Sequence, residues 1–106
     1  MAQADGGQDP VRVLIADDHP LMLGALRQAV LGAVPGAVIS EARDYDSLTA
    51  AFEATPDIDL VLLDLSMPGV RGFSGLLYLR SERPSAPVIV VSVSYTHLTL
   101  PTILRV

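Results

Sequence analysis

Four short, mostly apolar runs constrain the fold of this sequence more than any other feature. They cover residues 11–16 (VRVLIA), 37–42 (AVISEA), 60–63 (LVLL) and 88–91 (VIVV). Each run has the length of a strand, and most are too apolar for either face to contact water. Strands that are buried on both faces belong in a parallel sheet covered by helices. The runs therefore predict an α/β fold with a doubly wound parallel sheet.

Segments with helical spacing separate the four runs, as this fold requires. In the first segment, which starts at Pro20, the apolar stripe predicted to face the sheet comprises Met22, Leu26, Ala29, Val30 and Ala33. In the second, which Asp44 or Asp46 is predicted to cap, the inward residues are Leu48, Ala51 and Phe52. The third is predicted to be a helix that ends near Arg83, and the residues along it are Phe73, Leu76, Leu77 and Arg80.

Composition narrows the class of protein further. The chain has no cysteine, which excludes a disulfide framework and a thiolate metal site. No stretch approaches the roughly 20 apolar residues of a membrane span, and residues 1–10 read as a flexible leader without signal-peptide features. The net charge of −5 argues against direct DNA binding by this chain. We therefore expect a cytoplasmic protein with no membrane association.

Oxygen-bearing side chains follow three of the predicted strands. Asp17 and Asp18 follow the first strand, Asp64 follows the third, and Ser92 follows the fourth. The carboxyl ends of neighbouring parallel strands meet at one edge of the sheet, so these side chains are expected to converge. Crowded carboxylates repel each other and favour a hard cation such as Mg²⁺. One carboxylate beside such an ion can act as a nucleophile toward a phosphoryl group.

Each of these residues also has an ordinary structural interpretation. An Asp pair after a strand commonly caps a helix, and Ser92 alone is an ordinary strand-end hydroxyl. His19 is either a metal ligand or, as the sequence favours, a surface residue near the start of a helix. The combination of an acidic pair, a later Asp and a later hydroxyl at strand ends favours the chemical interpretation.

Two segments carry a resemblance to a known family. ADDHPL (16–21) and LVLLDLSMPGVRG (60–72) closely resemble the receiver domains of two-component response regulators, and the first resembles the NarL/LuxR type. The resemblance covers about residues 11–92. It implies a flavodoxin-like doubly wound sheet with strand order 2-1-3-4. The fifth strand and fifth helix of the family are expected to be missing from this chain.

The resemblance also implies a role for each candidate site residue. Asp64 is the expected acceptor of a phosphoryl group from a sensor histidine kinase. Asp18 is the expected direct Mg²⁺ ligand, Asp17 supports it partly through water, and the backbone carbonyl of Ser66 supplies another ligand. Ser92 matches the switch hydroxyl that binds the phosphoryl group. The intact protein is expected to be a transcription regulator that forms a receiver homodimer, with its DNA-binding domain outside this chain.

Two other functions remain open at this point. A haloacid-dehalogenase-like phosphate-transfer enzyme uses a similar sheet, but it usually needs a second acid two residues after the nucleophile, where this chain has Ser66. A pseudo-receiver would only bind partner proteins. The intact Asp17, Asp18 and Asp64 argue against that reading, and the absence of lysine keeps it open.

Residues 93–106 (VSYTHLTLPTILRV) do not continue the resemblance. They are too short for a fourth helix, a fifth strand and a fifth helix, and the chain has no lysine to match the one that the family carries after strand five. Residues 93–102 instead resemble one reading frame of a transposase adapter used in sequencing libraries. We therefore expect this tail to be non-native, and His97 to carry no function.

The absence of a native fifth strand and fifth helix is expected to lower the stability of the chain. Without a fifth strand, the run 88–91 is expected to form an exposed apolar edge that promotes aggregation. Without a fifth helix, the face of the first helix that carries Met22, Leu26 and Val30 is expected to lack a covering partner. The chain is then predicted to be marginally stable or insoluble.

Overall fold

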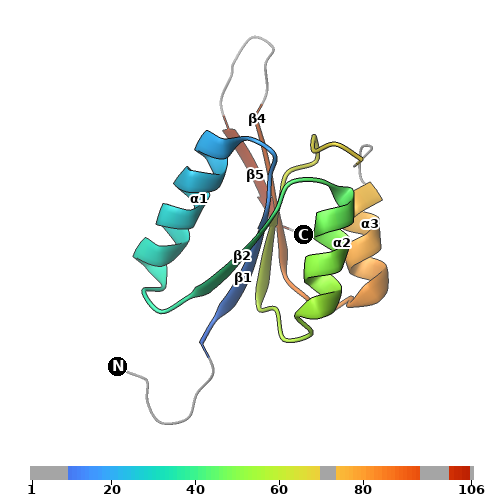
Figure 1. Cartoon of the computed structure of the whole chain (residues 1–106), viewed down its shortest axis with the longest axis horizontal. Helices are drawn as coiled ribbons and strands as arrows, with labels where there is room; N and C mark the ends of the chain where they lie inside the picture. Colours follow the sequence, from blue (N-terminus) through green and yellow to red (C-terminus); the bar gives the residue numbers. More distant parts are fainter. Residues whose placement is uncertain (1–9, 70–73, 94–100, 106) are drawn as a thin grey trace.

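The computed structural model describes residues 10–69, 74–93 and 101–105, with side chains up to Val91. These residues form a sheet flanked by helices (Figure 1). In chain order the elements are β1 (Arg12–Ala16), α1 (Pro20–Ala33), β2 (Val38–Ala42), α2 (Tyr45–Ala54), β3 (Leu60–Leu63), α3 (Ser74–Glu82), β4 (Val88–Val93) and β5 (Pro101–Arg105). The four predicted strands and three predicted helices are all present, with ends that differ from the predictions by at most a few residues.

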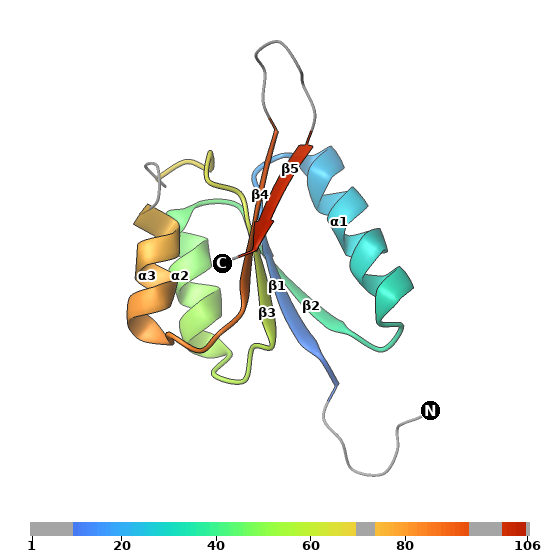
Figure 2. The same cartoon turned by 180° about the vertical axis from the view of Figure 1, so that it is seen from behind.

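The sheet has the strand order β2-β1-β3-β4-β5, and its first four strands are parallel. The predicted order 2-1-3-4 is therefore confirmed. Helix α1 covers one face of the sheet, and α2 and α3 cover the other (Figures 1 and 2). In this doubly wound arrangement β1 and β3 are neighbours, with Ala16 opposite Leu63, so both strands end at the same edge.

The structure corrects the prediction that β4 is an exposed edge. β5 pairs with β4 in antiparallel register, from Ile89 opposite Arg105 to Val93 opposite Pro101. A parallel neighbour would need a crossover of about a dozen residues or more, whereas an antiparallel one needs only a short connection. Residues 94–100 leave room only for the short connection, so the tail supplies a strand of the opposite direction. Within the described residues, no helix follows β4.

Alternate residues of β1 point into two separate core layers. Leu14 and Ala16 pack with Leu48 and Phe52 of α2, and belong to the larger layer beneath α2 and α3. Val13 and Ile15 point the other way, into a smaller layer that contains Leu23 of α1. This alternation follows from the two-residue period of a strand, and it explains why the strands are apolar throughout.

Helix α1 lies alone on its face of the sheet among the described residues, so the predicted absence of a covering helix is confirmed for this part of the chain (Figure 1). Of its 14 residues only Leu23 is fully buried, while Leu26 and Val30 pack partly against the sheet. The predicted stripe was wrong at Ala29 and Ala33, which are exposed. No described helix is both long and apolar enough to cross a membrane.

Helix α2 matches its prediction closely. Asp44, one of the two predicted caps, is the N-cap, and its carboxylate accepts a hydrogen bond from the Ser47 amide at 2.7 Å. The Ser47 hydroxyl accepts in return from the Asp44 amide, which completes a capping box. The hydrogen bond from the Ser47 amide holds the pKa of Asp44 below its usual value. Leu48 and Phe52 are buried, as predicted.

The helix predicted to end near Arg83 is present as α3, although the sequence did not indicate which of its faces is buried. Its buried residues are Gly75 and Leu79, which stand about one helical turn apart. Leu76 packs partly against the core, whereas Leu77 is 67% exposed. Phe73 lies outside the described residues.

A leucine-to-alanine substitution can be made at a buried position of α2 and at an exposed position of α3, and the two losses of stability can be compared. Leu48→Ala removes a fully buried side chain and is expected to lower the free energy of unfolding by about 2–5 kcal/mol. Leu77→Ala removes an exposed one and should change it by less than about 0.5 kcal/mol. Urea denaturation followed by circular dichroism measures both, and equal losses would contradict this orientation of α3.

Candidate functional site

The three predicted carboxylates converge at the carboxyl ends of β1 and β3. The amide of Asp64 donates a hydrogen bond to the carbonyl of Ala16 at 2.8 Å, which continues the β1–β3 ladder past the last paired residues. One ligand atom from each of Asp17, Asp18, His19 and Asp64 lies within 4.8 Å of the others. Asp17 and Asp64 are buried, with exposed fractions of 2% and 4%. The sequence prediction of an acidic cluster at this edge is therefore confirmed in geometry.

The negative charges of these carboxylates are not fully offset by the groups around them. Burial raises the pKa of Asp17, hydrogen bonds from the backbone and ring of His19 oppose that rise, and the charge of Asp64 adds to it. Asp18 Oδ1 is buried and makes no hydrogen bond among the described residues, although the ring Nδ1 of His19 lies 3.1 Å from it. A buried carboxylate oxygen is costly unless a positive charge lies against it, whether a protonated imidazole or a metal ion. The donor set therefore fits a hard divalent cation such as Mg²⁺.

His19 reaches into the same cluster. Its ring Nδ1 lies 3.1 Å from Asp17 Oδ1, 3.1 Å from Asp18 Oδ1 and 3.8 Å from Asp64 Oδ2. The hydrogen bond to Asp17 and the charge of Asp18 raise the pKa of His19. The side chain is 50% exposed, so the favoured prediction of a surface residue was right about exposure and missed the contact. The signal in the sequence was its position directly after the acidic pair at a strand end.

Ser66 holds one oxygen of Asp64. Its amide and its hydroxyl both donate to Asp64 Oδ1, at 3.0 Å and 2.8 Å. The other oxygen, Oδ2, lies on the side of His19. The carboxylate is therefore fixed in orientation by its own loop. The role of the Ser66 carbonyl as a metal ligand stays a prediction.

The loop after Asp64 is anchored by contacts that the sequence did not reveal. Met67 follows Asp64 in this loop, yet it is 1% exposed and packs in the larger core layer. The Tyr45 amide donates to the carbonyl of Pro68 at 3.0 Å, which ties the loop to the start of α2. Gly69 has a φ of +82°, and a Cβ there would lie 2.9 Å from the Cβ of Tyr45. Only glycine combines this conformation with this close approach.

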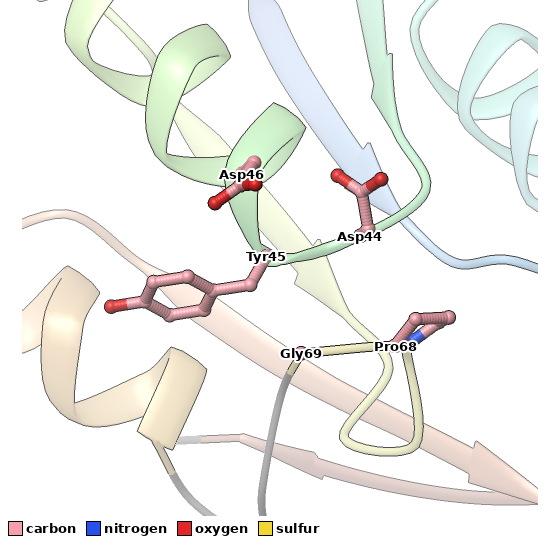
Figure 3. Close-up of a pocket in the computed structure, with 5 residues that line it drawn as sticks. All are labelled: Asp44, Tyr45, Asp46, Pro68 and Gly69. Atoms are coloured by element: carbon pink, nitrogen blue, oxygen red, sulfur yellow. The ribbon is translucent and has the colours of Figure 1, made fainter.

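A pocket lies beside this anchor and not at the acidic cluster. Its lining residues are Asp44, Tyr45, Asp46, Pro68 and Gly69 (Figure 3). The two aspartates come from the first turn of α2, where they cap and complement the helix. The pocket is thus the space between the α2 start and the loop, and the cluster of acids remains the candidate site.

The backbone of Ser92 lies in β4, opposite Thr102 of β5. Its side chain lies outside the described residues, so the predicted switch hydroxyl stays a prediction.

Comparison with known proteins agrees with this fold. The family model of the response regulator receiver domain matches residues 13–105. The chain belongs to this family. It is a receiver domain of the NarL/LuxR type, as the resemblance of its two segments implied.

Three related proteins illustrate the similarity. A glycerol metabolism activator of Pseudomonas putida is 44% identical over 81 residues, which are 76% of this chain and 37% of that protein. The nitrate/nitrite response regulator protein NarL of Escherichia coli K12 is 37% identical over 87 residues, 82% of this chain and 40% of that protein. The isolated receiver domain of RcsB from Salmonella enterica serovar Typhimurium superposes with a TM-score of 0.68 at 29% identity, over 83% of this chain and 65% of that one. The chain thus spans about two fifths of the curated relatives' length.

Substituting glycine by alanine at two positions tests the loop anchor. Gly69→Ala is expected to lower the free energy of unfolding by about 1–3 kcal/mol, because of its positive φ and the clash with Tyr45. Gly24→Ala, inside α1 with open space around it, is expected to raise it by about 0.5–1 kcal/mol. Thermal and urea unfolding report both values. A neutral Gly69→Ala would show that the loop does not depend on this contact.

Proposed function

We propose that this chain is a phosphoacceptor receiver in which Asp64 takes a phosphoryl group from a sensor histidine kinase with the help of Mg²⁺. The observation that carries the proposal is the convergence of Asp17, Asp18 and Asp64, two of which are buried, at the carboxyl ends of β1 and β3. The similar receiver domain of RcsB was studied with phosphomimetic BeF₃⁻, which is consistent with a phosphoryl site in that protein.

The chemistry requires little movement of Asp64. A carboxylate oxygen forms a new bond to phosphorus while the P–N bond of a phosphohistidine breaks, and the electron pair of that bond returns to the imidazole nitrogen. The two hydrogen bonds from Ser66 hold Asp64 Oδ1, which leaves Oδ2 as the better-placed nucleophile. The product is an acyl phosphate on Asp64.

Mg²⁺ would be held by Asp18, Asp64 and the Ser66 carbonyl, with Asp17 acting partly through water. When bound, it offsets the charge that repels an incoming phosphoryl group from three carboxylates. Because Asp17 and Asp64 are buried, that repulsion is only weakly screened by solvent. The role of the acidic pair is to fix the cation beside the acceptor.

The wider role belongs to the intact protein. We propose that it is a cytoplasmic transcription regulator, with a DNA-binding output domain outside this chain and a receiver homodimer as its active form. The net charge of −5 argues against DNA contact by the receiver itself. Capture of the phosphoryl group by the Ser92 hydroxyl is the proposed link between Asp64 and the surface that signals.

The phosphatase-like alternative is less well supported by the geometry. An enzyme of the haloacid dehalogenase type would need an acid where Ser66 stands, and the Ser66 hydroxyl is already committed to Asp64 Oδ1. No general acid for a leaving group is supplied by that position. Turnover of a generic phosphoester would nevertheless favour the enzyme, and partner binding independent of Mg²⁺ would favour a pseudo-receiver.

We also propose that residues 11–92 are the native receiver segment, that residues 1–10 are a leader, and that residues 93–106 are a non-native tail. The reversed direction of β5 supports this division, since the four strands before it are parallel. The family match reaches residue 105 and so does not mark the boundary. Resequencing the locus past the codon for Ser92 tests it: a lysine-bearing continuation is expected, and recovery of the same tail would overturn it.

Phosphorylation by a small donor tests the main proposal. Incubated with acetyl phosphate and Mg²⁺, the chain should gain the mass of one phosphoryl group in intact-mass spectrometry. Asp64→Asn should abolish the gain. Asp57→Asn, which changes an exposed acid near the opposite end of β3, should leave it unchanged.

Three results would contradict the proposal. They are no gain in the unsubstituted chain, a gain that persists in Asp64→Asn, and a gain that does not depend on Mg²⁺.

A further inference from the structure

The ring of His19 lies among the carboxylates that are proposed to hold the cation directly or through water. Its Nδ1 is 3.1 Å from one oxygen each of Asp17 and Asp18, and 3.8 Å from Asp64 Oδ2. Mg²⁺ binds oxygen ligands at about 2.1 Å, and it keeps several waters in its octahedral shell. An imidazole nitrogen in contact with the same oxygens leaves no room for that shell. Ring and ion therefore exclude each other.

His19 is also poorly suited to serve as a ligand of the same ion. Mg²⁺ prefers oxygen donors, whereas imidazole suits softer metals. In the observed contact, Nδ1 is within hydrogen-bond distance of Asp17 Oδ1, where a protonated Nδ1 donates to the carboxylate. That interaction satisfies the carboxylate in place of a cation.

The local backbone allows the ring to leave without disturbing the site. The amide of His19 makes a separate hydrogen bond to Asp17 Oδ1 at 2.9 Å, which does not depend on the position of the ring. His19 is the N-cap of α1 and has no side-chain capping bond. Its side chain is 50% exposed, so a rotation toward solvent breaks few packing contacts.

We propose that His19 is an internal competitor for the metal site, whose ring occupies the acidic cluster and must swing out before Mg²⁺ binds. This inference rests on the proposed metal site. It gives His19 a positioning role: the residue sets the metal affinity of the receiver, and therefore the Mg²⁺ concentration at which Asp64 becomes a competent acceptor. Removing the ring and its one hydrogen bond from the cluster should change the Mg²⁺ affinity by several-fold and not by orders of magnitude.

Calorimetric titration of the chain with MgCl₂ at one fixed pH tests the proposal. His19→Ala is expected to bind Mg²⁺ about three-fold to ten-fold more tightly than the unsubstituted chain, because no ring has to be displaced. Leu21→Ala is the matched control, since it shortens a 90% exposed side chain in the first turn of the same helix. That variant should bind like the unsubstituted chain.

A second measurement follows the ring itself. In the unsubstituted chain, the ring ¹H–¹³C signals of His19 should move on saturation with Mg²⁺ to the positions of a solvent-exposed histidine. Unchanged or weaker Mg²⁺ binding by His19→Ala would overturn the inference, and weaker binding would identify His19 as a ligand. Absence of Mg²⁺ binding by both chains would instead contradict the proposed metal site, and Asp18→Asn provides the reference for that loss.

Discussion

The parallel pairing of β1 with β3 is the constraint on which the rest of this structure depends. It sets Ala16 opposite Leu63, and the hydrogen bond from the Asp64 amide to the Ala16 carbonyl extends the ladder to Asp64. The residues that follow each strand are thereby forced together although they repel each other. Burial of the strands on both sides supplies the free energy that holds like charges in place. The acidic cluster is thus a consequence of how the core is packed.

Much of this arrangement could be predicted from the sequence because it follows from strong, local patterns. Apolar runs of strand length identify β1, β3 and β4, and their parallel order brings Asp17, Asp18 and Asp64 to one edge. The capping role of Asp44 was readable from residue type and position. In each case one physical requirement, burial of a strand or satisfaction of a helix end, is decided by a few neighbouring residues.

The features that were missed depend on contacts between distant parts of the chain. Leu77 and Leu79 are equally apolar, and only the approach of α3 to the sheet decides which one is buried. Met67 looks like part of a turn, yet its side chain fills the core beneath α2 and α3. The contact of His19 depends on a rotamer, which no periodicity encodes. β5 was missed because the expectation considered only a parallel neighbour for β4.

The two faces of the sheet differ in how many helices cover them. Two helices cover the larger core layer, and that layer includes Met67 of the loop after Asp64. One helix covers the other layer, and His19 is its N-cap. Asp64 is therefore held by Ser66 on the well-packed side, while the residue proposed to move belongs to the less covered side. The side of the sheet that orients Asp64 is thus well packed, and the side that carries His19 has the freedom that exchange of a cation would require.

The most direct test of the central claim is an NMR titration of the ¹⁵N-labelled chain with beryllofluoride, with and without Mg²⁺. We expect the amide signals of Asp18, Asp64 and Ser66 to shift only when both components are present, because the proposed acceptor carboxylate and the proposed cation site form one unit. Unchanged amide signals at these residues, or the same shifts without Mg²⁺, would contradict it.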